Sequence, residues 1–293
     1  MRKFIKQKRA GFTLIELSLS LAFISILSIT IVMIINDMIL TYQKGLVLKQ
    51  VNTVGTELVD EFSSAISQSP TNDLKSLCST LYTSDSSARQ SCQDDNAYKF
   101  VLAVRTADVK IGSGTKTASS APVFGAFCSG KYTYIWNSGY FFNSNDYEVA
   151  DVEMATFSYK KDDGTTAKIE NFRLLKVLDP SHSICYTANG YESSNVISNS
   201  FETDNVITEE PTDILSGDYS NLALYDLYIS KPAQDNQSKN AFYSGSFILA
   251  TVQGGINIKS SGNYCATPSE YKVENFDYCA INKFNFAKQA NGV

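Results

Sequence analysis

The first 70 residues of the chain form one long apolar stretch followed by an amphipathic one. Residues 17–35 contain no charged side chain, and with residues 12–15 they are long enough to cross the hydrocarbon core of a bilayer, about 30 Å thick, as a helix. After Asp37, apolar residues recur at spacings of three or four, which predicts a helix with one buried face. These residues are Val47, Val51, Val54, Leu58, Phe62 and Ala65. Pro70 predicts the end of the helix, because the residue before a proline disfavours helical geometry.

We therefore expect one continuous helix over about 13–67, with a membrane half at residues 12–36 and an amphipathic half at residues 37–69. Gly45 and Gly55 are its weak points, since each glycine costs about 1 kcal/mol relative to alanine inside a helix. Either they are small residues tolerated for close packing, or they mark places where the helix bends or melts.

Residues 70–293 are predicted to form a β-rich globular domain. Residues 71–97 are polar and predict a loop, and residues 188–218, rich in Asn, Ser and Glu, predict a second long loop. Strand-like runs occur at Tyr98–Arg105, Val123–Phe127, Lys131–Trp136, Tyr147–Tyr159, Ala167–Leu178, Leu222–Ser230 and Ala241–Val252. The pair Asp163-Gly164 predicts a hairpin turn, since it supplies the positive φ angles of such turns. The expected fold class is α+β: a long N-terminal helix packed on an antiparallel, β-rich head.

Composition and charge narrow the possible functions. The chain is 43% hydrophobic and 12% aromatic with a net charge of −5, which excludes a disordered protein. This acidic balance argues against a direct nucleic-acid partner, which needs a basic surface. His182 is the only histidine, so a metal site built on several imidazoles is excluded. Acidic pairs such as Asp94-Asp95 leave a calcium ion as an open alternative, but no EF-hand spacing occurs, and no cofactor is expected.

Two segments resemble catalytic motifs only faintly. His182 lies between Ser181 and Ser183, but neighbouring serines do not make a catalytic triad, and no G-x-S-x-G turn is present. Residues 112–116 (GSGTK) lack the spacing of a phosphate-binding loop. We therefore expect no catalytic residues and no enzyme, with a membrane-anchored exported enzyme as a remaining alternative.

The chain begins with a basic segment, residues 1–11, whose charged residues are Arg2, Lys3, Lys6, Lys8 and Arg9. Basic residues before an apolar span place the N-terminus in the cytoplasm and the rest of the chain outside. The apolar run is too long for an ordinary signal peptide, and no A-x-A-like cleavage site follows it. A simple membrane anchor leaves Glu16 unexplained, because a charged side chain inside an apolar span costs about 2.5–3.5 kcal/mol unless it is paired or lies near the interface.

The run Lys8-Arg9-Ala10-Gly11-Phe12-Thr13-Leu14-Ile15-Glu16-Leu17 resembles the N-terminal signature of type IV pilins and type II secretion pseudopilins. In that family a prepilin peptidase cuts after the glycine, on the cytoplasmic face, and the new N-terminal residue is methylated. The resemblance therefore implies cleavage between Gly11 and Phe12 and N-methylation of Phe12. It covers about residues 8–66, and beyond them only the architecture is similar.

The resemblance also implies that Glu16 is an assembly contact, since a glutamate at this place is a hallmark of subunits that join the filament. Physically, Glu16 of one subunit can pair with the freed Phe12 amine of its neighbour, and a buried polar pair of this kind sets the register between subunits. A Glu16 that only reaches the lipid headgroups is the alternative. Cleavage leaves 20 basic and 30 acidic residues over 12–293, a net charge of −10.

All six cysteines lie on the predicted exported side, at positions Cys78, Cys92, Cys128, Cys185, Cys265 and Cys279. An even number of exported cysteines suits disulfide bonds, although six allow fifteen pairings. The equal spacing within Cys78–Cys92 and Cys265–Cys279 favours those two pairs, which leaves Cys128 with Cys185. A metal site is the weaker alternative, because no C-x-x-C spacing occurs.

The mature chain of 282 residues is larger than a typical major pilin and resembles large minor pilins and J-type pseudopilins. Such subunits lie at or near the filament tip and help to initiate assembly. The implied partners are other pilin or pseudopilin subunits, the prepilin peptidase, the inner-membrane assembly platform and membrane lipid. The implied location is a single pass through the cytoplasmic membrane and then a periplasmic or extracellular filament. A pilus-displayed adhesin is the alternative function.

Overall fold

A computed structural model describes residues 13–68, 102–111, 116–129, 131–143, 147–180, 184, 198–230, 241–252, 256–259, 262–265 and 279–290. The chain divides into two compact units, Met1–Leu46 and Val47–Val293. The predicted leader, residues 1–11, and its cleavage junction with Phe12 lie outside the described residues.

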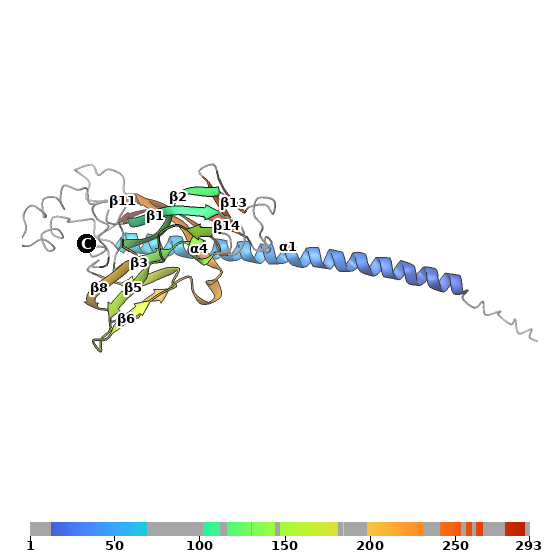
Figure 1. Ribbon diagram of the computed structural model, residues 1–293, viewed down its shortest axis with the longest axis horizontal. Helices are drawn as coiled ribbons and strands as arrows, with labels where there is room; N and C mark the ends of the chain where they lie inside the picture. The colour runs from blue at the N-terminus through green and yellow to red at the C-terminus, as the bar shows by residue number, and fades with distance from the viewer. Residues whose placement is uncertain are drawn as a thin grey trace, which may run out of the picture. The chain divides into compact units, whose positions relative to one another are not determined.

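One helix, α1, runs without a break from Leu14 to Gln68 (Figure 1). The helix predicted over about 13–67 is thus confirmed, and neither Gly45 nor Gly55 interrupts it. In the first unit, the large apolar side chains of α1 are exposed, from Leu14 at 84% to Tyr42 at 68%. In the second unit, the apolar positions predicted from the spacing are buried, among them Val51, Val54, Leu58, Phe62 and Ala65.

Within the residues described by the structure, the second unit contains four sheets. Their strands are β1 (Leu102–Ile111), β2 (Lys116–Ser129), β3 (Tyr132–Asn137), β4 (Tyr147–Val149), β5 (Thr156–Lys160), β6 (Thr166–Ile169), β7 (Leu174–Leu178), β8 (Ser200–Val206), β9 (Thr212–Asp213), β10 (Leu222–Ser230), β11 (Ala241–Thr251), β12 (Ile256–Lys259), β13 (Gly262–Cys265) and β14 (Ile281–Ala290). The largest sheet has the order β4-β1-β2-β3-β7-β9, and smaller sheets are β10-β11-β14, β6-β5-β8 and β12-β13. The α+β prediction is confirmed.

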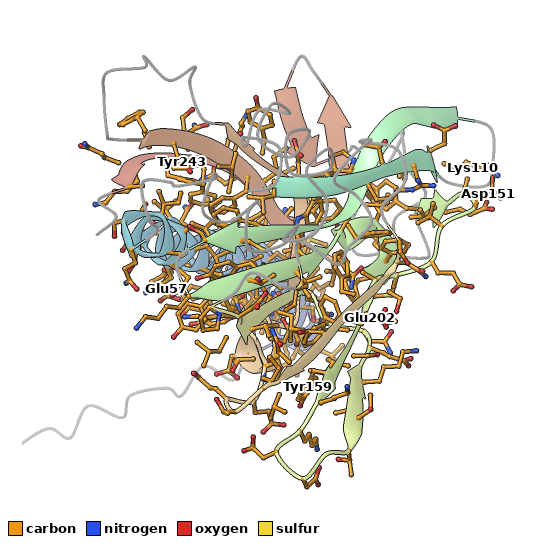
Figure 2. The ribbon with its side chains drawn as sticks, turned by 90° about the vertical axis from the view of Figure 1, so that its left-hand side faces the viewer. Glu57, Lys110, Asp151, Tyr159, Glu202 and Tyr243 are labelled. Carbon is orange, nitrogen blue, oxygen red and sulfur yellow. The ribbon has the colours of Figure 1, made fainter. Side chains whose placement is uncertain are left out.

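The expectation of antiparallel pairing holds for every described pair except one. Strand β8 pairs with β5 in parallel, with Phe157 opposite Phe201. Both rings are fully buried, and this burial outweighs the polar composition that predicted a loop over residues 188–218. That loop prediction is wrong for β8 and β9. Figure 2 shows Tyr159 of β5 and Glu202 of β8 on this small sheet.

The predicted hairpin turn at Asp163-Gly164 is confirmed. It joins β5 to β6, and the Gly164 amide donates to the Lys161 carbonyl at 2.9 Å. Only Gly164, at φ +79°, takes a positive φ angle in this turn. The Asp163 carboxylate instead accepts a hydrogen bond from the Thr165 amide at 2.8 Å, so the aspartate stabilises the turn through its side chain.

The part of α1 in the second unit packs into an aromatic core. Phe62 lies at its centre, in contact with the rings of Tyr134 and Phe247 at centroid distances of 5.3 and 5.7 Å. On β3 the side chains alternate, so that Tyr134 and Trp136 join the core of the helix while Ile135 joins a second core on the other face of the sheet. The period-two pattern of this strand therefore serves two cores at once.

Strand β10 keeps four apolar side chains on the helix side although their spacing is irregular. Leu222 and Leu224 are followed, after three residues rather than two, by Leu227 and Ile229, and all four belong to the core of the helix. A shift in the pairing with β11 between Leu224 and Asp226 absorbs the extra residue, as a β-bulge does. The residue at the bulge, Tyr225, points into the second core.

We predict that Gly139→Ala destabilises the second unit by about 1–3 kcal/mol, because a new methyl group would overpack a filled core. Gly139 opens the short helix α4 (Gly139–Phe142), and a Cβ atom there would lie 2.2 Å from the Tyr225 ring. That ring is held, since its hydroxyl donates to the Thr251 carbonyl at 3.0 Å. Denaturant unfolding would measure the change. Gly45→Ala is the matched control, since nothing lies within 4 Å of its Cβ, and a loss of stability there equal to that of Gly139→Ala would contradict the packing argument.

Candidate functional site

Thr13 and Glu16 together cap the start of α1. The Glu16 carboxylate accepts hydrogen bonds from the Thr13 amide and the Thr13 hydroxyl, both at 2.9 Å. The Thr13 hydroxyl in turn accepts from the Glu16 amide at 3.3 Å. This reciprocal arrangement is a capping box, which satisfies amides left without partners in the first turn of a helix. The sequence analysis missed it, although the T-x-x-E spacing of residues 13–16 is its usual signal.

Glu16 therefore has a local role that does not need a second subunit. Among the described residues, its carboxylate contacts only Thr13. The structure thus adds an explanation for a carboxylate at the head of an apolar helix, beside the expected pairing with the Phe12 amine of a neighbour. Gly11 and Phe12 lie outside the described residues, so the cleavage, methylation and assembly roles stay predictions.

The helix that follows this cap is long and apolar enough to cross a membrane, by length and composition. A shallow groove on its surface begins at Glu16 and continues along Leu19, Ser20, Phe23 and Ile26. Glu16, Leu19, Phe23 and Ile26 follow one another at spacings of three or four, so they share one side of the helix. The first unit therefore presents an exposed apolar surface with one carboxylate at its start.

The hydroxyl groups in this apolar half of α1 are satisfied by the helix itself. Each donates to a backbone carbonyl three or four residues earlier, as Ser25 does to Leu21 and Ser28 to Ile24, both at 2.8 Å. The other members of the set are Ser18, Ser20 and Thr30. Such back-bonding leaves no hydroxyl of the set in need of an outside partner.

In the second unit, a charged cluster connects α1 to the large sheet. Glu61 of the helix accepts a hydrogen bond from the Tyr134 hydroxyl and forms an ion pair with Lys176 of β7, both at 2.6 Å. Burial opposes the charge on Glu61, but the hydrogen bonds from Lys176 and Tyr134 outweigh it, so the pKa of Glu61 lies below its ordinary value. Burial raises the pKa of Tyr134, and the hydrogen bond to the Glu61 carboxylate raises it further. The Tyr134 hydroxyl therefore keeps its proton and stays a hydrogen-bond donor.

We expect Glu61→Gln to unfold more easily than the wild type at pH 7, and we expect this difference to shrink as the pH is lowered towards 3. A carboxyl group whose pKa is lowered on folding stabilises the protein above its ordinary pKa of 4.5, and this contribution is lost as the pH falls through the folded value. The side chain is 32% exposed, so we expect only about 1 kcal/mol. Unfolding measured across this pH range tests it, with the exposed Glu57→Gln as control. A difference that persists unchanged at pH 3 would rule out the ionic explanation.

Two further contacts hold the helix to the head. The Gln50 side chain donates to the Asp218 carbonyl at 2.8 Å and accepts from Asn221 at 3.1 Å. Two residues further along the helix, Asn52 accepts from the side chain of Asn282 on β14 at 2.8 Å. These contacts join residues more than 160 positions apart, and no local sequence pattern indicates them.

Two of the six cysteines can be placed. Cys128 and Cys279 are both disulfide-bonded, and the described part of the chain contains no free cysteine. The predicted pairing stays a prediction, because Cys78, Cys92 and Cys185 and the side chain of Cys265 lie outside the described residues.

A buried aspartate organises the surroundings of Cys128. Asp179, which is 2% exposed, accepts hydrogen bonds from the Thr133 hydroxyl and the Ile184 amide, both at 3.0 Å. Thr133 lies opposite Cys128 in the sheet. The Asp179 carboxylate is thus used in fixing the fold of its neighbours, and His182, which invited a catalytic interpretation, lies outside the described residues.

No group of three or more histidine, cysteine, aspartate or glutamate side chains able to hold a metal ion occurs within the described ranges. The calcium alternative therefore gains no candidate site from this part of the chain. Two candidate functional surfaces remain among the described residues. One is Glu16 with the exposed half of α1, and the other is the acidic surface beside Glu61.

Comparison with known proteins adds no relative to these observations. No protein-family model, no curated protein and no solved structure matches the chain. The function must therefore be argued from the sequence and the geometry above.

Proposed function

We propose that the chain is a structural subunit of a type IV pilus or a type II secretion-like filament, of the minor pilin or pseudopilin kind. In this proposal it is made as a prepilin, crosses the cytoplasmic membrane once through the first half of α1, and carries its β-rich head outside. It joins other pilin or pseudopilin subunits at or near the filament tip, where it aids the initiation of assembly.

The observation that carries the proposal is the division of one unbroken helix into two kinds of surface. The apolar side chains of α1 are exposed up to about Leu46 and buried from Val51 onward. A helix that packs a head at one end and exposes some 30 apolar-rich residues at the other needs a second environment for the exposed part. Lipid supplies that environment before assembly, and the helices of neighbouring subunits supply it in a filament.

The position of Glu16 supports the same reading. It stands in the first turn of α1, four residues after the Gly-Phe junction that resembles a prepilin cleavage site. Small hydroxyl residues occur along the same segment, and such residues favour close approach between helices in a membrane. Cleavage after Gly11 would remove all five basic residues of the segment 1–11 and leave a free amine close to Glu16.

The first test is the mature N-terminus. Mass spectrometry of the protein isolated from its own cells should find a chain that begins at Phe12 and carries one additional methyl group on its amine. Gly11→Leu should retain the leader, because glycine lets an extended backbone lie close inside a protease cleft and leucine does not. Replacement of Ala10 by serine is a matched control that should leave cleavage unchanged. An exported protein that still carries residues 1–11 would refute the processing step and favour the simple anchor.

A further inference from the structure

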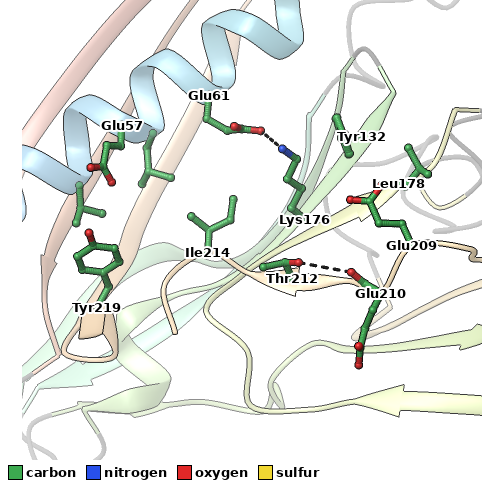
Figure 3. A pocket seen from close by; sticks show the side chains of 12 residues that line it. Glu57, Glu61, Tyr132, Lys176, Leu178, Glu209, Glu210, Thr212, Ile214 and Tyr219 are labelled. Carbon is green, nitrogen blue, oxygen red and sulfur yellow. Dashed lines mark hydrogen bonds and ion pairs between the residues drawn. The ribbon is translucent and has the colours of Figure 1, made fainter. Parts of the chain in front are cut away.

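The second unit has a pocket of about 410 Å³ beside the C-terminal part of α1 (Figure 3). One wall is the helix, with Glu57 and Glu61. The opposite wall is formed by Lys176 of β7 and by the segment before β9, which contributes Glu209. Ile214 and Tyr219 close the remaining side. The wall residues come from four separate segments, so the fold itself shapes the pocket.

The pocket has more negative than positive charge. Glu57, Glu61, Glu209 and Glu210 line it together with one cation, Lys176, and the Glu210 carboxylate points away from the centre of the pocket in Figure 3. That cation is already engaged, since it pairs with Glu61 at 2.6 Å and lies 4.1 Å from the centre of the Tyr132 ring. Neither Glu57 nor Glu209 has an ion-pair or hydrogen-bond partner for its carboxylate within the part of the chain described by the structure. Two carboxylates are thus left for an incoming positive group.

The rest of the lining distinguishes between kinds of cation. Val54, Leu58 and Ile214 give the pocket an apolar floor, and the Tyr219 ring forms part of its rim. Figure 3 shows Glu57 and Tyr219 pointing toward one another, with Glu209 on the far side beside Leu178. A small metal ion needs several oxygen ligands that converge on it, and no such group occurs among the described residues. A cation on an apolar stem uses both parts of the lining.

Lysine and arginine side chains have this chemistry, because their methylene stems cover apolar surface while the charged end stays with a polar partner. Arginine suits the rim better, since its planar guanidinium stacks on aromatic rings and donates to a carboxylate through two N–H groups at once. The negative charge of the pocket favours a positively charged side chain. An acidic side chain would add to the unpaired negative charge, and a neutral side chain would leave the carboxylates unpaired.

We propose that this pocket binds an arginine or lysine side chain, with arginine preferred, presented by another protein chain. The partner segment places its alkyl stem over Leu58 and Ile214 and its charge between Glu57 and Glu209. The inference stands apart from the filament role, because it uses only residues of the second unit and no step of cleavage or assembly.

The test uses the full-length protein in detergent micelles and three capped tripeptides as probes: Ala-Arg-Ala, Ala-Lys-Ala and Ala-citrulline-Ala. Citrulline has nearly the shape of arginine without its charge. Titration followed by the NMR signals of ¹³C-labelled tyrosine rings should show saturable binding of the arginine peptide, weaker binding of the lysine peptide and none of the citrulline peptide. The double variant Glu57→Gln/Glu209→Gln should weaken arginine binding by about tenfold, since each exposed pair contributes up to about 1 kcal/mol.

Asp60→Asn is the matched control. Asp60 lies on α1 between Glu57 and Glu61 and is exposed, but it does not line the pocket. Its removal should leave binding unchanged within about twofold. Equal binding of the citrulline and arginine peptides, or equal weakening by the control and the double variant, would overturn the inference. Neither result touches the cleavage test, so the two proposals can fail separately.

Discussion

Phe62→Ala should lower the free energy of unfolding of the second unit by about 3–5 kcal/mol, the range for removing a large ring from a filled core. Phe62 is fully buried and lies at the point where α1 meets the six-stranded sheet and the β10-β11-β14 sheet. Its ring contacts Phe127 and Tyr134 of the six-stranded sheet at centroid distances of 5.9 and 5.3 Å. It also contacts the ring of Phe247 in the β10-β11-β14 sheet, at a centroid distance of 5.7 Å.

The loss should exceed that of an ordinary core phenylalanine, because edge-on ring contacts add to the burial of apolar area. Denaturant unfolding of the full chain in detergent, followed by tyrosine and tryptophan fluorescence, measures it. Phe242→Ala is the control, since that ring is 50% exposed and its loss should cost less than about 1 kcal/mol. Equal losses for the two variants would mean that α1 is not held to the sheets through Phe62.

The second large effect is expected at the start of α1, where the capping box and the proposed assembly contact use the same carboxylate. Glu16→Gln keeps the cap, because glutamine also serves at this place in a capping box, but it removes the charge. We expect this variant to be inserted and cleaved normally and to be nearly absent from filaments. The cause is that the Phe12 amine of the neighbour would be buried without its partner, at a cost of several kcal/mol.

Thr13→Val is the matched control for the cap. It removes the hydroxyl partner of Glu16 and weakens the helix start by about 0.5–2 kcal/mol, yet it keeps the negative charge. Cleavage and filament incorporation should be followed separately in both variants. If Thr13→Val reduces incorporation while Glu16→Gln does not, Glu16 acts through the helix cap and not through its charge. If neither reduces it, Glu16 is not an assembly contact, as expected for a subunit at the extreme tip or for a simple anchor.

The sequence predicted the elements whose signal is local. The helix follows from an apolar stretch and a spacing of three or four, and its observed bounds, Leu14–Gln68, differ from the prediction by one residue at each end. Strand β10, Leu222–Ser230, has the predicted bounds because apolar and aromatic residues fill it from Leu222 to Ile229, with Asp226 as the one charged residue between them. The predicted run Tyr147–Tyr159 contains two strands instead of one, β4 and β5.

The elements that were missed depend on contacts with distant residues. Strand β14 pairs along its whole length with β11, yet its exposed face carries Asn and Lys, which weakens the apolar signal of Ile281, Phe284 and Phe286. Phe284 lies against Gly55 of α1, where a Cβ atom would come within 2.0 Å of the ring. Gly55 is therefore a small residue that allows close packing, and not a place where the helix bends or melts. Its partner, Phe284, lies 229 residues away in the sequence.

The candidate site divides in the same way. Glu16 was singled out because a carboxylate is unusual in an apolar stretch, whereas its partner Thr13 was not, although the two are only three residues apart. Lys176 and Glu209 belong to segments with no distinguishing motif. Only the folded chain brings them beside Glu57 and Glu61, so no reading of the sequence alone could have found the pocket.

The serine and threonine hydroxyls along the first half of α1 affect how easily this segment could be transferred between lipid and a protein-lined setting. Each hydroxyl proton is already donated to a carbonyl of the same helix, as with Ser25 and Leu21. Moving the helix from lipid into a protein-lined setting therefore breaks no hydrogen bond, and moving it back leaves no hydroxyl group unsatisfied in the hydrocarbon. In the proposed filament role, packing and Glu16 then set the difference in free energy between the two settings, and the hydroxyl groups add nothing to it.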